Sequence, residues 1–248
     1  VYDKPVMFSN APLTRIAHAA EQIKQNAEKK MNQLVKKLKS KYKNVSFEVL
    51  SRDGLAPERL LEVAKKFSVD MIIMGSTGTS KLERLLIGST TARILRDAPC
   101  PVLSIPKNAV FEGLNKIVFA TDLNEDNIGS ASMISTFAKK FDAEIAFLFV
   151  DDKHLLHSEE HISAMTQKIR KRVKYGKISG YISKNTSITK GIEFFLKKKP
   201  ADILVMFTHA RHFPDSMFNS SITKMMSHQA NIPLLALKHF DKPLLAPN

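Results

Sequence analysis

The 248-residue sequence has no tryptophan, a single cysteine and no long hydrophobic run. Its longest uninterrupted apolar stretch, Ile145 to Val150, is far shorter than the roughly 20 residues that span a bilayer. The lone cysteine, Cys100, excludes an intramolecular disulfide and is typical of proteins of the reducing cytosol. No charged and then apolar leader opens the sequence. We therefore expect a cytoplasmic protein with no membrane partner.

The composition is that of an ordinary globular protein, with 44% hydrophobic and 25% charged residues, which argues against disorder and collagen-like scaffolding. The 38 basic residues exceed the 24 acidic ones, giving a net charge of +14. The basic runs Lys168–Lys174 and Lys197–Lys199 would suit nucleic acid or another anionic ligand. Because no aromatic residues alternate with them, we interpret them as solvated helix faces and do not expect a nucleic-acid partner.

One sequence unit occurs twice. Sliding the sequence so that residue 65 falls on residue 197 aligns Lys65–Ile105 with Lys197–Leu237 without a gap. Two apolar runs stay in register, and a proline opens the second run in both copies: Asp70–Met74 falls on Asp202–Met206, and Pro101–Ile105 falls on Pro233–Leu237. The repeat predicts two domains, residues 1–108 and residues 116–248, joined by a linker rich in Asn and Gly.

Strand and helix patterns alternate within each copy. Met71–Met74 and Val102–Ile105 are short apolar runs of the kind buried on both faces of a parallel sheet. Helical spacing lies between them, and Pro57–Phe67 reads as a helix with proline in its first turn. Val45–Leu50 is predicted to be the preceding strand. This order predicts an α/β fold with two doubly wound domains, each built on a parallel sheet.

The two copies differ at their beginnings. The second opens with a strand at Lys116–Ala120, continues with a helix from Ile128 to Phe141, and then has a strand at Glu144–Val150. The opening Val1-Tyr2-Asp3 resembles the end of that second strand. We therefore expect the first domain to lack its N-terminal strand and helix. A rearranged or shortened domain is the alternative.

Long helical segments also differ between the copies. The first has an amphipathic stretch from Thr14 to Lys41, with an apolar stripe and lysines on the other faces. The second has a shorter segment from His154 to Lys174. His154, His157 and His161 would share one face of that helix, which is the spacing of a zinc half-site or of an ordinary solvated helix. His209 and His212 fall in a later loop, and we assign no metal ligand from either group.

Glycines carry the main functional signal. Met74 is followed by Gly75-Ser76-Thr77-Gly78, and nine residues later by Gly88-Ser89-Thr90. Glycines after a strand let a ligand approach the backbone without a Cβ in the way, and the start of a helix offers free N–H groups to an anion. The spacing is neither a P-loop nor the dinucleotide fingerprint. The residues alone leave phosphate binding and plain turn glycines as alternatives.

This glycine pattern, followed by the strand Ala98-Pro-Cys-Pro-Val-Leu103, resembles the universal stress protein family. Lys116–Ala120 running into Thr121-Asp122 is similar to the opening of that family's domain, with Ala120 where proline is usual. The resemblance covers both copies and implies a tandem member. It implies five-stranded parallel sheets of the adenine nucleotide alpha hydrolase-like fold. It also implies that Val102–Ile105 and Leu234–Leu237 pair with one another.

By this resemblance the first domain would bind ATP or a related adenine nucleotide. The cofactor-binding residues it implies are Val1, near the adenine, and Met74, Gly75, Ser76, Gly78, Gly88, Ser89 and Thr90, around the ribose and phosphates. In the second copy Phe207, Ala210 and Ser220 stand in place of Gly75, Gly78 and Gly88. The second domain is therefore predicted to be degenerate, with a structural or regulatory role.

No nucleophile and base are recognisable, so no catalytic residue is assigned. Cys100 between two prolines suits packing better than catalysis. The sequence predicts a nucleotide-binding stress-response regulator, with at most weak ATPase or autophosphorylation activity, and a possible homodimer. An interaction or scaffold protein of the same fold that binds no nucleotide is the alternative.

Overall fold

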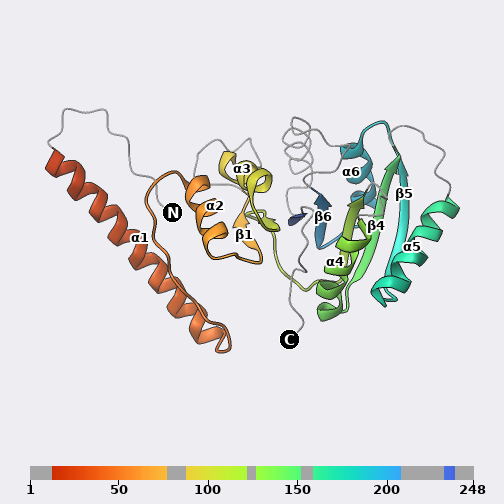
Figure 1. Ribbon diagram of the computed structural model, residues 1–248, viewed down its shortest axis with the longest axis horizontal. Coiled ribbons are helices and arrows are strands. Elements are labelled where there is room, and N and C mark those ends of the chain that lie inside the picture. Colours follow the sequence, from red (N-terminus) through yellow and green to blue (C-terminus); the bar gives the residue numbers. More distant parts are fainter. Residues whose placement is uncertain (1–12, 77–87, 122–126, 152–158, 208–231, 238–248) are drawn as a thin grey trace. The chain divides into compact units, whose positions relative to one another are not determined.

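The computed structural model describes residues 13–76, 88–121, 127–151, 159–207 and 232–237. The chain divides into two compact units, residues 1–66 and residues 67–248. The first unit contains the helices α1 (Leu13–Lys41) and α2 (Ala56–Lys66) (Figure 1). The second contains the helices α3 (Ser89–Asp97), α4 (Asn127–Phe141), α5 (Glu159–Val173) and α6 (Ile188–Lys198). Its strands are β1 (Ile72–Gly75), β2 (Val102–Ile105), β3 (Lys116–Thr121), β4 (Glu144–Asp151), β5 (Ile178–Lys184), β6 (Ile203–Phe207) and β7 (Leu234–Leu237).

All seven strands form one sheet in the order β1-β2-β7-β6-β3-β4-β5. Neighbouring strands run parallel except β2 and β7, which are antiparallel. The five strands β5-β4-β3-β6-β7 come from the second half of the chain. Their order reverses direction at β3, as in doubly wound α/β folds. The predicted α/β class and the predicted pairing of Val102–Ile105 with Leu234–Leu237 are both confirmed.

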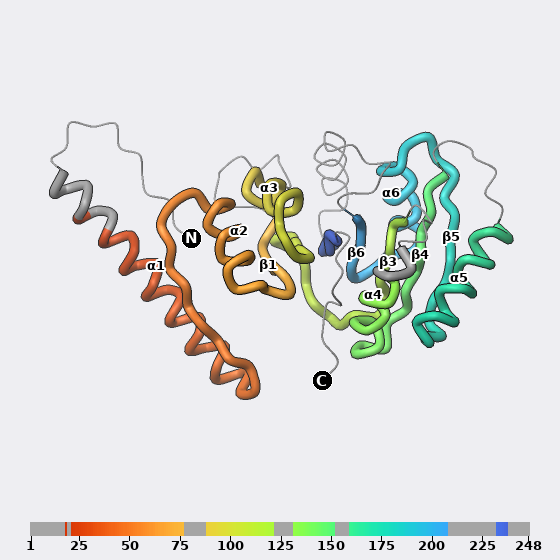
Figure 2. The backbone as a smooth tube through the Cα atoms, in the orientation of Figure 1, coloured from red at the N-terminus to blue at the C-terminus, as the bar shows by residue number. Residues whose placement is uncertain are grey.

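Helices cover both faces of this five-stranded part of the sheet, in which β3, β4 and β5 lie side by side (Figure 2). Along β4, alternate residues point to opposite faces. Phe147 belongs to the core that also takes in buried residues of α4 and α5. Val150 faces the opposite side, where it touches Gly191 of α6. Because β4 is buried on both faces, it is apolar almost throughout, as expected for a central parallel strand.

Three phenylalanine rings fill the centre of the core between the sheet and α4. Phe119 of β3 is fully buried, with its ring centroid 5.2 Å from that of Phe147 and 5.4 Å from that of Phe207. Tilted ring pairs at such separations add about 0.5–1.5 kcal/mol to the stabilisation that comes from burial alone. The cluster therefore joins β3, β4 and β6, the strands where the sheet order reverses.

The recurring aspartate of the repeat has a structural role in the second half. The Asp202 carboxylate accepts hydrogen bonds from the backbone N–H groups of Asn115, at 2.6 Å, and Lys116, at 2.8 Å. The Asp202 N–H donates in turn to the Lys116 carbonyl at 2.9 Å. These bonds fix the start of β3 beside the start of β6 and set their parallel register.

The offset of the sequence repeat recurs in the elements. Adding 132 to the bounds of α2 gives those of α6, and adding it to the bounds of β2 gives those of β7. The register of β1 with β2 also reappears between β6 and β7, with Ile72 opposite Val102 in the first and Leu204 opposite Leu234 in the second. The β1–β2 and β6–β7 units are therefore built alike, residue for residue.

Two strand predictions fail for one physical reason. Val45–Leu50 is not a strand, and Val45 is 50% exposed. The matching strand β5 pairs with β4, whereas the described residues of the first half contain no equivalent of β4. The prediction that Met71–Met74 is buried on both faces is also wrong, because Ile73 is 63% exposed. β1 forms an edge of the sheet, whereas its counterpart β6 lies between β3 and β7.

The predicted helices at Thr14–Lys41, Pro57–Phe67 and Ile128–Phe141 are confirmed as α1, α2 and α4, within a few residues. In the described part of the chain no helix is both long enough and apolar enough to cross a membrane. The domain boundary predicted at residues 108–116 stays a prediction. Strands from both sides of that linker belong to one sheet, because β2 pairs with β7.

Candidate functional site

The candidate site lies where the end of β1 meets the start of α3. Gly75 is the last residue of β1, and Ser76 follows it with 3% of its surface exposed. The Ser76 N–H donates to the Ile105 carbonyl at 2.9 Å. The Gly88 N–H donates to the Ser76 carbonyl, also at 2.9 Å. The two glycine groups of the sequence motif are thus joined by a direct backbone hydrogen bond.

A buried threonine strengthens this junction. The Thr91 hydroxyl, in the first turn of α3, donates to the Gly75 carbonyl at 3.1 Å. Thr91 is 2% exposed, so water does not compete for this bond. α3 is therefore held with its N-terminus at the carboxyl ends of β1 and β2, and open α/β sheets bind ligands at the carboxyl ends of their strands.

The first turn of α3 begins at a glycine. Gly88 is the N-cap, and among the described residues no side chain caps the first N–H groups of the helix. Unpaired N–H groups and the helix dipole favour negative charge at this end. The φ and ψ of Gly88 are −69° and 152°, which any residue adopts. Its lack of a side chain, rather than its backbone conformation, is what would matter to a ligand.

The structure brings together five of the eight predicted binding residues: Gly75, Ser76, Gly88, Ser89 and Thr90. Ser89 is exposed and Thr90 is half-buried at the start of α3, so their hydroxyls lie in the same turn as the open N–H groups. Met74 is half-buried in β1. Val1 and Gly78 lie outside the described residues.

The corresponding place in the second half holds an aromatic ring. Phe207 ends β6 where Gly75 ends β1. Its side chain is 4% exposed and packs on Phe119 in the core. Phe207 therefore contributes to packing at the position of the first glycine. Ala210, Ser220 and Asp122 lie outside the described residues.

The histidine predictions cannot be followed far in the fold. His161 is an exposed residue in the first turns of α5, and His154, His157, His209 and His212 lie outside the described residues. Within the described ranges, no three His, Cys, Asp or Glu side chains are grouped as a metal site would require. Cys100 is buried, as expected for a residue that serves packing.

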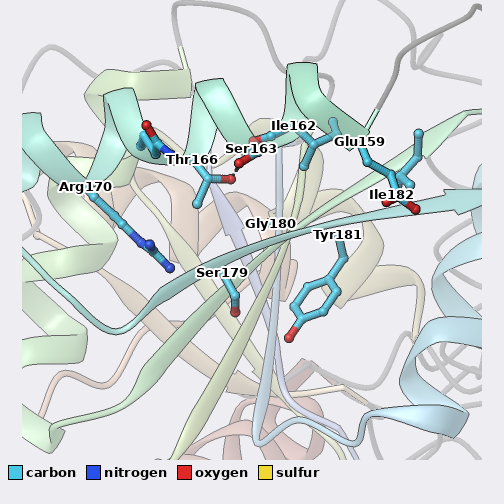
Figure 3. A pocket seen from close by; sticks show the side chains of 10 residues that line it. Glu159, Ile162, Ser163, Thr166, Arg170, Ser179, Gly180, Tyr181 and Ile182 are labelled. Carbon is cyan, nitrogen blue, oxygen red and sulfur yellow. Dashed lines mark hydrogen bonds between the residues drawn. The ribbon is translucent and has the colours of Figure 1, made fainter.

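A second hollow, which the sequence does not predict, lies between α5 and β5. It has a volume of about 570 Å³ and is lined by both elements (Figure 3). Glu159 and Arg170 stand at its two ends, and Gly180 forms its floor. In the sequence, the feature that could have indicated this hollow is a polar stripe at helical spacing, formed by Glu159, Ser163, Gln167 and Arg170. Such stripes are common on solvated helices, so the spacing alone does not reveal a pocket.

One carboxylate near this hollow has a shifted pKa. Burial by itself would raise the pKa of Glu144, but a hydrogen bond from Ser179 and the charge of Lys116 outweigh it, and the pKa is lowered. The Lys116 Nζ lies 3.4 Å from the Glu144 carboxylate. The contacts of Glu144 with Lys116 and Ser179 join β3, β4 and β5 near the beginnings of these strands.

A doubly wound sheet with a glycine-bounded junction between a strand end and a helix N-terminus places the molecule in the adenine nucleotide alpha hydrolase-like class of folds. Residues 1–106 match the model of the universal stress protein family. Universal stress proteins also recur among the curated relatives and among the solved structures of similar fold. The chain is therefore similar to the universal stress protein family over its first 106 residues, which are less than half of its 248.

The sequence relatives match in part of their length. A universal stress protein of Methanocaldococcus jannaschii is 42% identical over 55 residues, which are 22% of this chain and 32% of that protein. A universal stress protein A homolog of Coxiella burnetii is 37% identical over 82 residues, which are 33% of this chain and 52% of that protein. The chain thus spans about a third to a half of these relatives.

Solved structures extend the likeness of fold to the whole chain. A universal stress protein from Archaeoglobus fulgidus has a TM-score of 0.74 at 17% identity, covering 97% of this chain and 84% of that one. Another universal stress protein from Archaeoglobus fulgidus was solved in complex with dAMP. It has a TM-score of 0.37 at 17% identity, covering 50% of this chain and 98% of that one.

Proposed function

We propose that the first half of the chain binds ATP or a related adenine nucleotide, with the phosphates at the N-terminus of α3. The observation that carries the proposal is the junction of Gly75, Ser76 and Gly88. In the part of the chain that the structure describes, no side chain caps the first turn of α3, which lies beside the carboxyl end of β1. Anions bind such helix starts through backbone N–H groups.

The side chains around this turn suit phosphate oxygens. Ser89 and Thr90 each offer a hydroxyl donor, and neither adds a negative charge. Gly75 and Gly88 present backbone without a Cβ, so the phosphates reach the N–H groups. The proposal includes Val1, Met74 and Gly78, which the family resemblance assigns to the same site.

Calorimetric titration with ATP tests the proposal. The chain should bind ATP, and Gly88→Phe should weaken binding at least about tenfold, because the ring would occupy the space over the first turn of α3. The φ and ψ of Gly88 are ones that any residue adopts, so the change requires no strained backbone. Gly176→Phe is the matched control, because a Cβ at Gly176 meets no atom within 4 Å. Equal binding by Gly88→Phe and the unmodified chain would contradict the proposal.

We further propose that the chain is a tandem member with a second domain that binds no nucleotide and serves as a structural or regulatory copy. Phe207, packed into the core where the first half has Gly75, supports this division. It also favours the alternative function, an interaction protein of the same fold without any nucleotide. Absence of ATP binding by the unmodified chain would select that alternative. A role in stress response and a cytoplasmic location stay predictions.

A further inference from the structure

The free edge of β5 has a pattern of residues that would be complementary to the same edge of a second copy. β5 is the last strand in the sheet, so one side of it has no neighbouring strand among the described residues. The Ile145 N–H donates to the Lys177 carbonyl at 2.8 Å, which turns the backbone groups of Lys177 toward β4. Because the direction alternates along a strand, Ile178, Gly180 and Ile182 turn theirs outward.

Both outward backbone groups of Ile178 are already occupied, since its N–H donates to the Gly176 carbonyl at 2.9 Å. The Arg170 side chain reaches from α5 and donates to the Ile178 carbonyl, with Nε at 2.7 Å. An arginine at this position limits pairing at the first part of the edge, a common way of restricting strand addition. The outward groups of Gly180 and Ile182 have no such partner among the described residues. The Gly180 groups can therefore pair with Gly180 of another strand, whereas Ile182 would lie opposite the occupied Ile178 of that strand.

α5 overhangs this edge with an exposed polar stripe of Glu159, Ser163, Gln167 and Arg170. The stripe is acidic at one end and basic at the other (Figure 3). Its buried counterpart on the same helix, which includes Ile162 and Thr166, packs against the sheet. The stripe is thus the side of α5 that a neighbour at the β5 edge would meet.

The middle of the polar stripe on α5 lies over Gly180, near the middle of β5. A Cβ at Gly180 would meet Thr166 Oγ1, and it would lie 2.8 Å from Ile162 Cγ2. Gly180 therefore lies beneath the α5 segment between residues 162 and 166. The midpoint between Glu159 and Arg170 falls in that same segment. A single twofold axis beside Gly180 would therefore relate both α5 and β5 to the same elements of a second copy.

We propose that a second copy of this chain docks antiparallel along β5, with Gly180 facing Gly180 across a twofold axis. In this arrangement Glu159 of each copy faces Arg170 of the other, giving two complementary charge pairs. No like charges meet on the strands, because Lys177 faces Ser183 and Lys184 faces Gly176. Glycine at this position lets α5 of each copy pack closely over its own β5.

Sedimentation equilibrium of the whole chain over a range of micromolar concentrations tests this proposal. A reversible dimer is expected. Glu159→Arg should weaken it at least about tenfold, since both charge pairs become like-charge contacts. Glu160→Arg, next to it and also exposed, changes the net charge equally and should leave the dimer intact. The double variant Glu159→Arg with Arg170→Glu should restore dimerisation.

The restored double variant separates a specific contact from a loss of fold, because each single change alone weakens the dimer. Three results would overturn the proposal. They are a chain that stays monomeric at all concentrations, a dimer that Glu159→Arg does not alter, and a double variant no stronger than Glu159→Arg alone. None of these results depends on nucleotide binding, so this proposal and the proposed function are tested separately.

Discussion

Leu103 of β2 lies directly opposite Leu235 of β7, and these two residues are equivalent positions of the sequence repeat. On one side of this pair Val102 faces Ala236, and on the other Ser104 faces Leu234. Each flanking pair becomes the other when the two halves are exchanged. A local twofold axis therefore passes between Leu103 and Leu235, as at the interface of a symmetric homodimer.

The two leucines on this axis should differ in their contribution to stability. Leu235 is 4% exposed and belongs to the main core, whereas Leu103 is half-buried and packs at its margin. Leu235→Ala should lower the free energy of unfolding by about 2–5 kcal/mol, and Leu103→Ala by less. Urea denaturation of both variants measures this. Equal losses would contradict the expectation that the more deeply buried leucine contributes more to stability.

Ser104 is the one polar residue among the three strand pairs at this axis. It is fully buried, and its hydroxyl has no hydrogen-bond partner among the described residues, whereas the equivalent residue is Ala236. Because an unpaired buried hydroxyl is costly, Ser104→Ala should raise the free energy of unfolding by about 1 kcal/mol. Ser183→Ala is the matched control, since the Ser183 hydroxyl donates to the Gly191 carbonyl at 3.1 Å. That variant should lose about 1 kcal/mol, and losses from both changes would refute the interpretation of Ser104.

Gly191 in α6 permits close packing on β4. A Cβ there would lie 2.5 Å and 3.0 Å from the two Cγ atoms of Val150, a residue with a stiff side chain. Replacing glycine by alanine in a helix normally gains about 1 kcal/mol. Here overpacking of about 1–3 kcal/mol opposes that gain, so Gly191→Ala should be destabilising. Thermal unfolding is the measurement.

Two further variants give the controls for Gly191. Gly176→Ala should be neutral or slightly stabilising, because a Cβ at that position meets no atom within 4 Å. Combining Gly191→Ala with Val150→Ala should cost less than the sum of the two single changes, since the smaller side chain leaves room for the added methyl group. Strict additivity would show that the contact with Val150 is not the cause.

Glu144 should make the stability of the fold depend on pH. Its pKa is lowered in the folded state by the Ser179 hydrogen bond and the Lys116 charge, which exceed the opposing effect of burial. Its contribution is therefore present above the unfolded-state pKa, about 4.3, and is lost as the pH falls through the folded-state value. Ser179→Ala should raise the pKa of Glu144 in a carboxyl NMR titration. An unchanged pKa would assign the shift to Lys116 alone.

Several strands of both halves could be predicted, because local apolar runs mark them. The apolar runs after Pro101 and Pro233 became β2 and β7 with the expected bounds. Val45–Leu50 has an equally good apolar pattern but no neighbouring strand to pair with among the described residues, so it is not a strand. Strand formation depends on a partner elsewhere in the fold, which a local pattern does not report.

The glycine junction could be predicted in its residues but not in its bonds. Gly75 and Gly88 stood out by their positions after a strand and before a helix. Their connection through the Ser76 carbonyl, and the support from Thr91, depend on how α3 returns to β1. The hydrogen bond from Arg170 to the Ile178 carbonyl could not be predicted either. In the sequence, an arginine that contacts a strand edge looks the same as an arginine exposed to solvent.

The antiparallel contact of β2 with β7 has a consequence for how the two halves can change. Because both strands belong to one chain, their association does not depend on protein concentration, whereas docking at β5 would follow mass action. A substitution in one half is not copied into the other, as it would be in two identical subunits. The shared sheet therefore allows the first half to keep Gly75 while the second half uses Phe207 for its core.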